Sequence, residues 1–387
     1  MTTATHTFDQ QTMVEVLNQQ QKPCLSIYQP THRTHPGNQQ DPIRFRNLFK
    51  SSVASLETLV GKHEATDLLA PLQAIAEDAE FWNTSLGGLA LLRSTNYLGV
   101  FRLQQAVPEL AIVAETFHLK PLLRAYQSAD RFQVLCLSRQ EIKLYAGTRY
   151  GLDEVPLAPG VPRTLEAALG EELTEPHLSV GSYGGVGSQQ SAMHHGHGSK
   201  SSEVELDAER FFRAVDRAIF TSHSQAARVP LILASLPEHR QLFHSLSRNE
   251  YLADEGIDGN PFALTPAELC DRAWEVVRRV QRQRLEALME RFGAAKARDR
   301  GSDALADVAR AVVAGRVDTL LVDGDRQIPG RIDATTGSVE PRPLSDAKTD
   351  DALDDLGALV LKMGGELIVL QSQQMPTDTG VAAIYRY

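Results

Sequence analysis

The feature that most constrains this chain is a run of small and polar residues at 181–202, GSYGGVGSQQSAMHHGHGSKSS. The run holds almost no large apolar side chain, so it cannot bury enough surface to offset the entropy lost on ordering. It precedes an acidic, amphipathic run at 204–220. Long glycine-rich loops inside compact domains are uncommon, and they are usually either functional or disordered. The run therefore predicts a long loop that can reach a large partner.

Length and charge narrow the class of protein. A chain of 387 residues is too long for one ordinary core and predicts two or three domains. Its net charge of −10 argues against broad nucleic-acid binding but permits local basic patches. We expect a cytoplasmic protein without a membrane partner, because no apolar run approaches the roughly 20 residues of a membrane helix and no secretory signal begins the chain. Cys24, Cys136 and Cys270 are isolated, which is typical of reduced thiols and forms no zinc pattern.

The first third of the chain has the pattern of a small α/β unit. Apolar spacing near 3.6 indicates helices, and short apolar runs between proline and glycine indicate strands and loops. The expected helices are 12–19, 47–59 and 68–79, the expected strands are 24–28, 88–92 and 97–103, and a polar loop is expected at 29–42.

The middle of the chain predicts a mixed sheet covered by helices. Residues 132–137 and 141–146 have the pattern of a β-hairpin. The segment opens with the run 119–126, and the other expected elements are helices at 204–220 and 238–247 and a buried strand at 231–234. Strand, crossover helix and strand in this order are typical of a mixed sheet.

The last third alternates helix and strand. Thr265 is placed to cap a helix, with Pro266 at the first helical position and Glu268 three residues after the cap. The further expected elements are helices at 304–314 and 350–363 and strands at 316–322, 366–370 and 381–387. With a glycine after the helix at 350–363, this pattern predicts an α/β/α sandwich.

Three stretches resemble one family. GRVDTLLV, DDLGALVLKMGGELIVL and MPTDTGVAAIYRY are similar to the C-terminal domain of the archaeo-eukaryotic release factor and Pelota superfamily, and most to its bacterial branch. LKPLLRAYQSADRFQVLCLSRQEIKLYAG resembles the opening of that branch's middle domain, and LSIYQPTHRTHPGNQQDPIRFRNLFK resembles its N-terminal start. The resemblance implies an α/β fold of three domains: an N-terminal α/β unit at 1–116, an RNase H-like middle domain at 117–256 with the long loop 181–202, and an L7Ae-like α/β/α domain at 257–387.

The same resemblance implies a ribosomal A-site ligand shaped somewhat like tRNA. Release factors of the family carry a Gly-Gly-Gln loop in the middle domain, whose glutamine helps place water against the peptidyl ester. This chain departs from that pattern, because the corresponding run is Gly187-Ser188-Gln189-Gln190. Ser188 would replace the second glycine at a point where close approach to RNA is needed. Gln189 and Gln190 are the candidate catalytic residues, and the alternative is a polar loop in which no single residue matters.

A basic cluster surrounds the loop at 29–42. Its cations are balanced within the run only by Asp41, so it is a candidate RNA-binding surface that would contact phosphates, together with Gly187 and Ser188 of the long loop. The alternative is a solvated helix start. The residues are His32, Arg33, His35, Arg44, Arg46 and Lys50.

Three further clusters have simpler explanations. The histidines of the long loop could bind zinc or nickel, but short histidine-rich loop tracts are more often incidental. Arginines on the helix after Thr265 lie at helical spacing from Glu275 and Glu286, which predicts surface ion pairs. A group of aspartates near 318–333 could hold magnesium, yet Arg326 and Arg331 lie among them. The residues are His194, His195, His197, Arg272, Arg278, Arg279, Arg282, Arg284, Arg291, Asp318, Asp323, Asp325 and Asp333.

From this resemblance we expect a ribosome-binding factor that occupies the A site in rescue or hibernation, without catalysis and without cofactor or metal. Its partners would be the ribosome and ribosomal RNA, and a delivering translational GTPase stays open, as does the oligomeric state. One alternative is a peptidyl-tRNA ester hydrolase that uses residues 187–190. The other is a binding protein that has left the ribosome.

Overall fold

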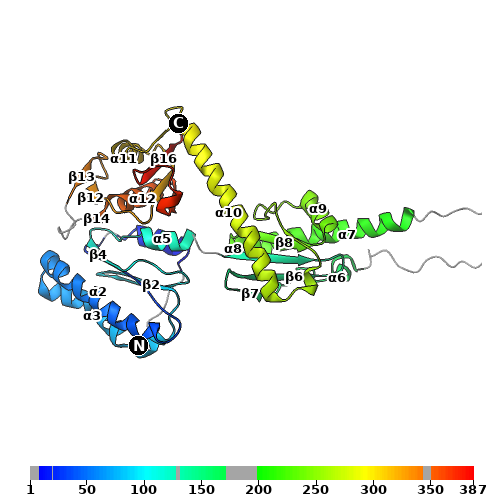
Figure 1. The fold of residues 1–387 in the computed structure, drawn as a ribbon, viewed down its shortest axis with the longest axis horizontal. Coiled ribbons are helices and arrows are strands. Elements are labelled where there is room, and N and C mark those ends of the chain that lie inside the picture. Colours follow the sequence, from blue (N-terminus) through cyan, green and yellow to red (C-terminus); the bar gives the residue numbers. More distant parts are fainter. Residues whose placement is uncertain (1–7, 20, 128–130, 171–197, 343–349) are drawn as a thin grey trace, which may run out of the picture. The chain divides into compact units, whose positions relative to one another are not determined.

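The computed structural model describes residues 8–19, 21–127, 131–170, 198–342 and 350–387. The chain divides into two compact units, one made of Met1–Ala129 with Ala287–Tyr387 and the other of Asp130–Glu286. Strands of the described residues form four sheets, and helices cover them in both units, so the expected α/β class is confirmed (Figure 1). The three-domain boundaries stay a prediction; the two compact units group the chain differently, since both ends share one unit.

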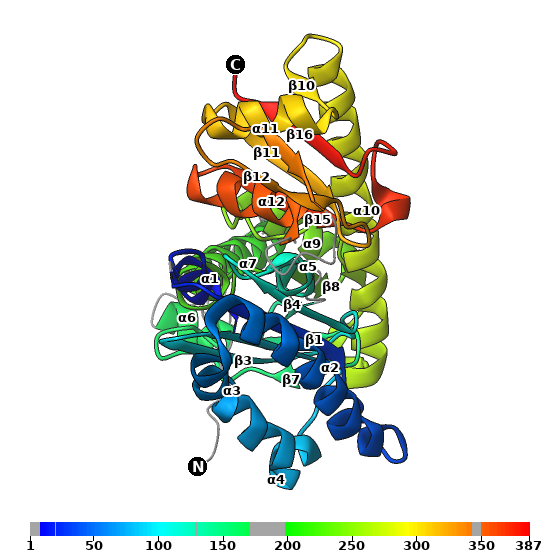
Figure 2. The ribbon, with the colours of Figure 1, turned by 90° about the vertical axis from the view of Figure 1, so that its left-hand side faces the viewer.

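The N-terminal part of the first unit is an antiparallel sheet in the order β3-β2-β1-β4. Alternate residues of β1 serve two cores: Leu25 and Ile27 pack under α2 and α3, whereas Cys24 and Tyr28 face α1 and α5. Figure 2 shows α2 and α3 together on one side of this sheet. The elements are α1 (Gln10–Leu17), β1 (Cys24–Pro30), α2 (Gly37–Val60), α3 (Lys62–Glu77), α4 (Ala79–Asn83), β2 (Gly88–Ser94), β3 (Tyr97–Leu103), β4 (Leu110–Ala114) and α5 (Lys120–Gln127).

The expected polar loop at 29–42 is wrong in its second half, because α2 already begins at Gly37. Pro42 lies inside the helix as its sixth residue, where it has no N–H to donate to the carbonyl oxygen of Asn38. Proline and glycine were interpreted as loop residues, although both are compatible with the beginning of a helix. The six basic candidates therefore lie on a short turn and on α2 rather than on one loop.

The C-terminal part of the first unit has a mixed sheet in the order β10-β16-β11-β15, with β11 and β15 parallel. A smaller sheet, β13-β12-β14, lies beside α12. The elements are β10 (Gly301–Ser302), α11 (Leu305–Val313), β11 (Val317–Asp323), β12 (Pro329–Ile332), β13 (Val339–Pro341), β14 (Asp350–Asp351), α12 (Ala352–Lys362), β15 (Glu366–Leu370) and β16 (Val381–Tyr385).

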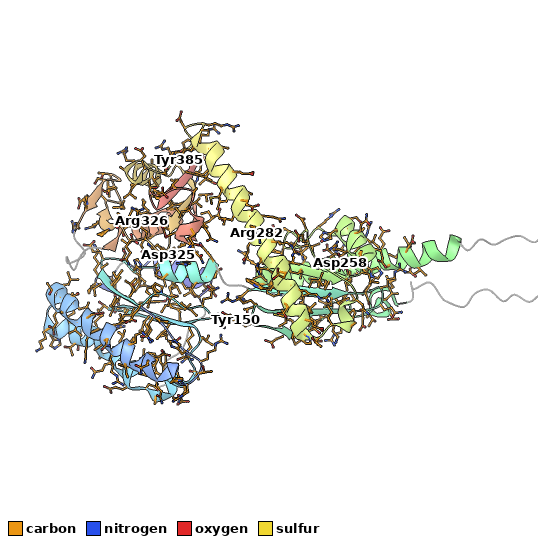
Figure 3. The ribbon with its side chains drawn as sticks, in the orientation of Figure 1. Tyr150, Asp258, Arg282, Asp325, Arg326 and Tyr385 are labelled. Carbon is orange, nitrogen blue, oxygen red and sulfur yellow. The ribbon has the colours of Figure 1, made fainter. Side chains whose placement is uncertain are left out.

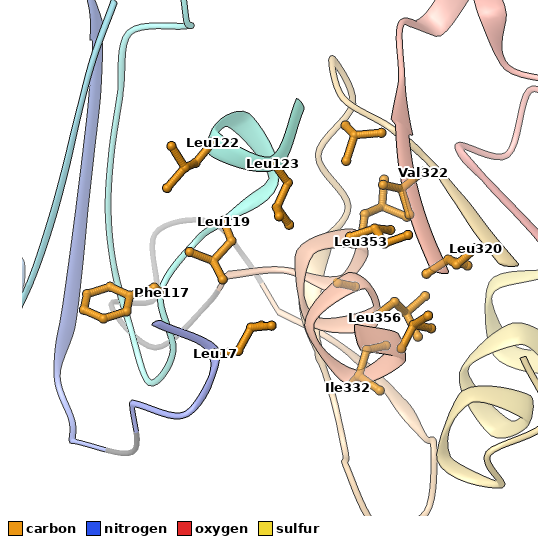
Figure 4. Close-up of a cluster of buried hydrophobic side chains, with 14 of the residues drawn as sticks. Leu17, Phe117, Leu119, Leu122, Leu123, Leu320, Val322, Ile332, Leu353 and Leu356 are labelled. Carbon is orange, nitrogen blue, oxygen red and sulfur yellow. The ribbon is translucent and has the colours of Figure 1, made fainter. Parts of the chain in front are cut away.

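The α5 segment joins the N-terminal and C-terminal parts of this unit. Leu119 and Leu123 share one apolar cluster with Leu353 and Leu356 of α12 (Figure 4). The Lys120 ammonium is 3% exposed and pairs with the Asp351 carboxylate, which is 2% exposed, at 2.5 Å. This buried ion pair and its apolar surroundings explain why the two ends of the chain form one compact unit.

Backbone hydrogen bonds complete this junction. Asp354 Oδ1 accepts from the backbone N–H of Leu119 at 2.8 Å and of Lys120 at 2.5 Å. The Gln127 side chain donates to Leu367 O at 2.5 Å and accepts from Val369 N at 2.9 Å, so it extends the edge of β15 like a further residue of a strand. The junction thus leaves few polar groups unpaired.

The second unit is a five-stranded sheet in the order β7-β6-β5-β8-β9. Strands β5, β6 and β7 form an antiparallel meander, and β8 and β9 run parallel to β5. The elements are β5 (Phe132–Leu137), β6 (Ile142–Thr148), β7 (Gly151–Glu154), α6 (Leu165–Leu169), α7 (Gly198–Ile219), α8 (Gln225–Ala227), β8 (Leu231–Ser235), α9 (Pro237–Leu246), β9 (Ile257–Asp258) and α10 (Pro266–Lys296). Helices α7 and α9 pack on one face of the sheet, and the first half of α10 packs on the other.

Several sequence predictions are confirmed in this unit. The hairpin of β5 and β6 forms, and Thr265 caps α10 together with Glu268, each side chain accepting from the other residue's backbone N–H. Helix α7 begins at Gly198, so the last residues of the run 181–202 are helical. Cys136 and Cys270 of this unit and Cys24 of the first unit are buried and form no disulfide.

Among the described residues, no helix is long and apolar enough to cross a membrane.

Candidate nucleic-acid interface

The buried side chain of Asp41 holds the residues of the candidate RNA-binding surface in place. Its carboxylate is fully buried under the turn between β1 and α2. The backbone N–H of His32 donates to Oδ2 at 2.7 Å, and the His32 ring Nδ1 donates to Oδ1 at 2.8 Å. Arg44 donates to Oδ1 at 3.2 Å. A buried carboxylate with these donors fixes the turn and the side chains of His32 and Arg44 at once.

The turn itself is tightly packed. Gly37 lies against the His32 ring, and a Cβ at this position would be 2.8 Å from His32 Cγ. Gln29, which is fully buried, donates to the backbone carbonyl of Asp41 at 3.1 Å. His32 is therefore held from both sides, although its side chain is 45% exposed.

Two polar groups of the loop between β3 and β4 contact the outer side of the cluster. Arg33 donates to the Gln104 side chain at 2.6 Å, and Arg44 pairs with Glu109 at 3.1 Å. These partners were not expected from the sequence, since a separation of more than sixty residues carries no local signal. The structure thus brings His32, Arg33 and Arg44 together on one supported surface.

The other three candidates have no partner in the described residues. His35, Arg46 and Lys50 are exposed, and Arg46 and Lys50 lie four residues apart on the same side of α2. Ile43, 48% exposed, lies beside them in the helix. A row of unpaired cations next to a rigid turn can contact phosphate oxygens without first breaking an ion pair.

Several predicted residues lie outside the described part of the chain. Gly187, Ser188, Gln189 and Gln190 fall in 171–197, as do His194, His195 and His197. Their proposed roles in hydrolysis, RNA contact or metal binding stay predictions.

The arginines of α10 are partly engaged in surface ion pairs, as expected. Arg278 pairs with Glu275 at 3.1 Å, which confirms the local prediction. Arg279 instead pairs with Glu255 at 2.5 Å, a residue of the preceding loop. Arg282, labelled in Figure 3, is exposed. This helix therefore carries a mixed surface rather than a continuous basic one.

The aspartates near 318–333 are occupied by protein donors. Asp323 accepts from the Ser372 hydroxyl at 2.8 Å and from the backbone N–H of Asp325 at 2.8 Å. Burial acts to raise the pKa of Asp325, but hydrogen bonds from Arg124 and from the backbone N–H of Ser372 lower this pKa on balance. Among the described residues no three His, Cys, Asp or Glu side chains are grouped as a metal site would need. These carboxylates therefore accept hydrogen bonds that stabilise loops. Asp325 is labelled in Figure 3.

Comparison with known proteins finds one family model that matches part of the chain. Residues 131–316 match the model of the bacterial archaeo-eukaryotic release factor family 3. This match confirms the resemblance expected from the sequence. No curated protein matches the chain significantly.

Solved structures give weaker likenesses. The archaeal translation termination factor aRF1 is 16% identical, with 97% of this chain and 96% of that chain covered and a TM-score of 0.24. Dom34 of S. cerevisiae is 13% identical, with 81% and 78% covered and a TM-score of 0.42. Archaeoglobus fulgidus Pelota is 14% identical, with 77% and 79% covered and a TM-score of 0.27. At these TM-scores the alignments establish no shared function.

Proposed function

Because residues 131–316 carry the family 3 signature, we propose that this protein is a cytoplasmic translation factor that binds the ribosomal A site and acts without catalysis in rescue or hibernation. The observation that carries the proposal is the cationic surface supported by Asp41. A net charge of −10 repels RNA over most of the chain, so a local and rigid cationic surface is what RNA binding requires.

The geometry of the surface supports phosphate contacts in particular. The Asp41 carboxylate holds His32 and Arg44 in place, so little side-chain entropy remains to be lost on binding there. Arg46 and Lys50 supply unpaired charges next to them. Such contacts position a protein on RNA and make its affinity depend on salt.

The fold supports the same function. In the second unit the antiparallel meander is followed by two parallel strands, which supports the proposed RNase H-like middle domain. The mixed sheet with α11 and α12 supports the proposed L7Ae-like C-terminal domain. A translational GTPase is a further partner to test.

Co-sedimentation with bacterial ribosomes across a salt series tests the proposal. We expect binding that cognate A-site tRNA displaces, and we expect the variant Arg33→Glu, Arg46→Glu, Lys50→Glu to bind weakly. The salt slope should also fall by about 0.7 to 0.9 for each lost phosphate contact. A matched control reverses three exposed cations elsewhere, Lys62→Glu, Arg298→Glu and Lys362→Glu, and changes the net charge equally. Equal binding of the two variants would contradict the assignment of this surface.

The ester-hydrolase alternative depends on the sequence Gly187-Ser188-Gln189-Gln190. It predicts release of a model peptide from ribosome-bound tRNA and loss of that release in Gln189→Ala with Gln190→Ala. Release that survives the double change would exclude these two residues.

A further inference from the structure

A second basic group lies at one edge of the sheet of the second unit. The carboxyl ends of the parallel strands β5 and β8 meet there, and each is followed by a short connection, 138–141 after β5 and Leu236 before α9. Asp258, at the end of β9, marks this edge in Figure 3, whereas Tyr150 marks the opposite end of the sheet. In open α/β sheets the carboxyl edge is where ligands bind.

The turn after β5 is rigid. The Ser138 hydroxyl accepts from the backbone N–H of Glu141 at 3.0 Å, and Ser138 N donates to Glu141 O at 3.0 Å. Gln140 O accepts from Leu165 N at 2.8 Å, so the turn is also joined to the start of α6. Arg139 lies at the tip of this turn with its backbone fixed on both sides.

A buried histidine orients the Arg139 side chain. Arg139 Nε donates to His239 Nε2 at 3.0 Å, while the His239 side chain packs edge-on against Phe212 with ring centroids 5.8 Å apart. His239 is only 6% exposed, and its Nδ1 has no partner among the described residues. Because Nε2 accepts this bond, the ring is neutral and its proton lies on Nδ1. Burial and then the charge of Arg139 lower the pKa of His239, which agrees with a neutral ring.

The terminal nitrogens of Arg139 are left for a ligand. Arg139 is exposed, and neither of its Nη atoms has a partner in the described part of the chain. The neighbouring cation, Arg240, is already paired with Asp258 at 3.0 Å. Glu238, exposed in the first turn of α9, is the other charged group beside His239. The neutral His239 ring thus accepts the hydrogen bond from Arg139 Nε. The two coplanar Nη groups remain available to a ligand with two acceptor oxygens.

We propose that Arg139, positioned by His239, is a phosphate-binding site at the carboxyl edge of the sheet of the second unit. A guanidinium held at Nε presents two parallel N–H groups, which match two oxygens of a phosphate. The ligand is an RNA phosphodiester or a free phosphate group. Arg139 contacts the ligand, and His239 is a positioning residue.

Binding to a labelled single-stranded RNA of about ten nucleotides tests the site in the full-length protein without ribosomes. We expect Arg139→Ala to weaken binding about tenfold, the effect of losing hydrogen bonds to a charged group. Arg139→Lys should weaken it nearly as much, because the ammonium keeps the charge but lacks the planar fork. The control Arg284→Ala removes an exposed arginine of α10. We expect this variant to bind the RNA nearly as well as the parent protein.

His239→Phe separates positioning from packing, since phenylalanine keeps the contact with Phe212 but accepts no hydrogen bond. We expect this variant to lower RNA affinity while circular dichroism and the unfolding midpoint show a folded second unit. Combined with Arg139→Ala, it should have no further effect on binding. An additive loss in the double variant would contradict the positioning role.

Inorganic phosphate as a competitor distinguishes the two sources of the ligand. If millimolar phosphate displaces the RNA from the parent protein, and this displacement requires Arg139, the ligand is a free phosphate group. If phosphate does not displace the RNA, the ligand is the phosphodiester. Unchanged binding of both probes in Arg139→Ala would overturn the site, and full binding in Arg139→Lys would overturn the oriented fork. Ribosomes are absent here, so this result and the test of the Asp41-supported surface can fail separately.

Discussion

Two buried aspartates pair with basic side chains that differ in their exposure to solvent. Asp41 is fully buried, but its partners His32 and Arg44 reach solvent, with side chains 45% and 26% exposed. Asp351 is 2% exposed, and its partner Lys120 is 3% exposed. Asp41 holds basic side chains that reach solvent, whereas Asp351 pairs with an ammonium group that is buried. The difference shows that the same ion-pair chemistry supports recognition in one place and joins distant parts of the chain in another.

The energetic expectations differ accordingly. Removing one partner from a fully buried pair leaves an uncompensated charge away from water, whereas an exposed cation that loses its partner is simply hydrated. The Lys120–Asp351 junction should therefore matter mainly for stability, and the Asp41-supported surface mainly for binding. Three measurements test this contrast and a fourth tests His239 of the second unit, from the largest expected effect to the smallest.

Lys120→Met should give the largest loss, about 3–5 kcal/mol of the free energy of unfolding of the first unit, because Asp351 would remain buried without its cation. Urea unfolding followed by circular dichroism measures it. Lys362→Met, on an exposed position of α12, is the matched control and should stay near the parent. If the two variants unfold alike, the buried pair does not stabilise the junction.

Asp41→Asn should have an intermediate effect, about 1–3 kcal/mol, because an amide replaces a buried acceptor of several hydrogen bonds. The same variant should also lose ribosome binding, since His32 and Arg44 are no longer held. Asp67→Asn is the control: Asp67 also pairs with a histidine, His63, but both side chains are exposed. Comparable destabilisation by both changes would remove the contrast between the buried and the exposed carboxylate.

Acid should weaken the second unit through His239. Burial and then Arg139 lower the pKa of this histidine in the folded state, so the unfolded chain binds the proton more readily. Stability is therefore present above the ordinary pKa near 6.5 and falls as the pH drops below it, by at most about 1.4 kcal/mol per pH unit. Urea midpoints between about pH 7.5 and 5.5 measure this slope. The slope should be smaller in His239→Phe, and an identical slope would assign the acid sensitivity to other groups.

Arg46→Ala with Lys50→Ala should change stability least, within about 0.5 kcal/mol, because both side chains are exposed and unpaired. Thermal unfolding checks this expectation, with ribosome co-sedimentation as the second measurement. A large loss of stability would mean that these cations belong to the fold rather than to a binding surface.

Local patterns in the sequence determined the elements and much of the family resemblance. The capping box of Thr265 and Glu268, the hairpin of β5 and β6, and the buried strands β11 and β15 follow from propensities and spacings within a few residues. The basic cluster around His32 could also be found this way, because its members lie close together in the chain. Where prolines were interpreted as loop residues, the start of α2 was missed, since helix beginnings also accept proline.

Only the tertiary structure decided which cations are buried, paired or free. Lys120 lies 231 residues before Asp351, and Arg139 lies 100 residues before His239. No local pattern links such residues, because an ion pair or a positioning hydrogen bond depends on where packing brings two side chains and on how much water it removes around them. The sequence alone therefore determined which charges this protein has, and the packing of distant segments decided which of them join the fold and which face a partner.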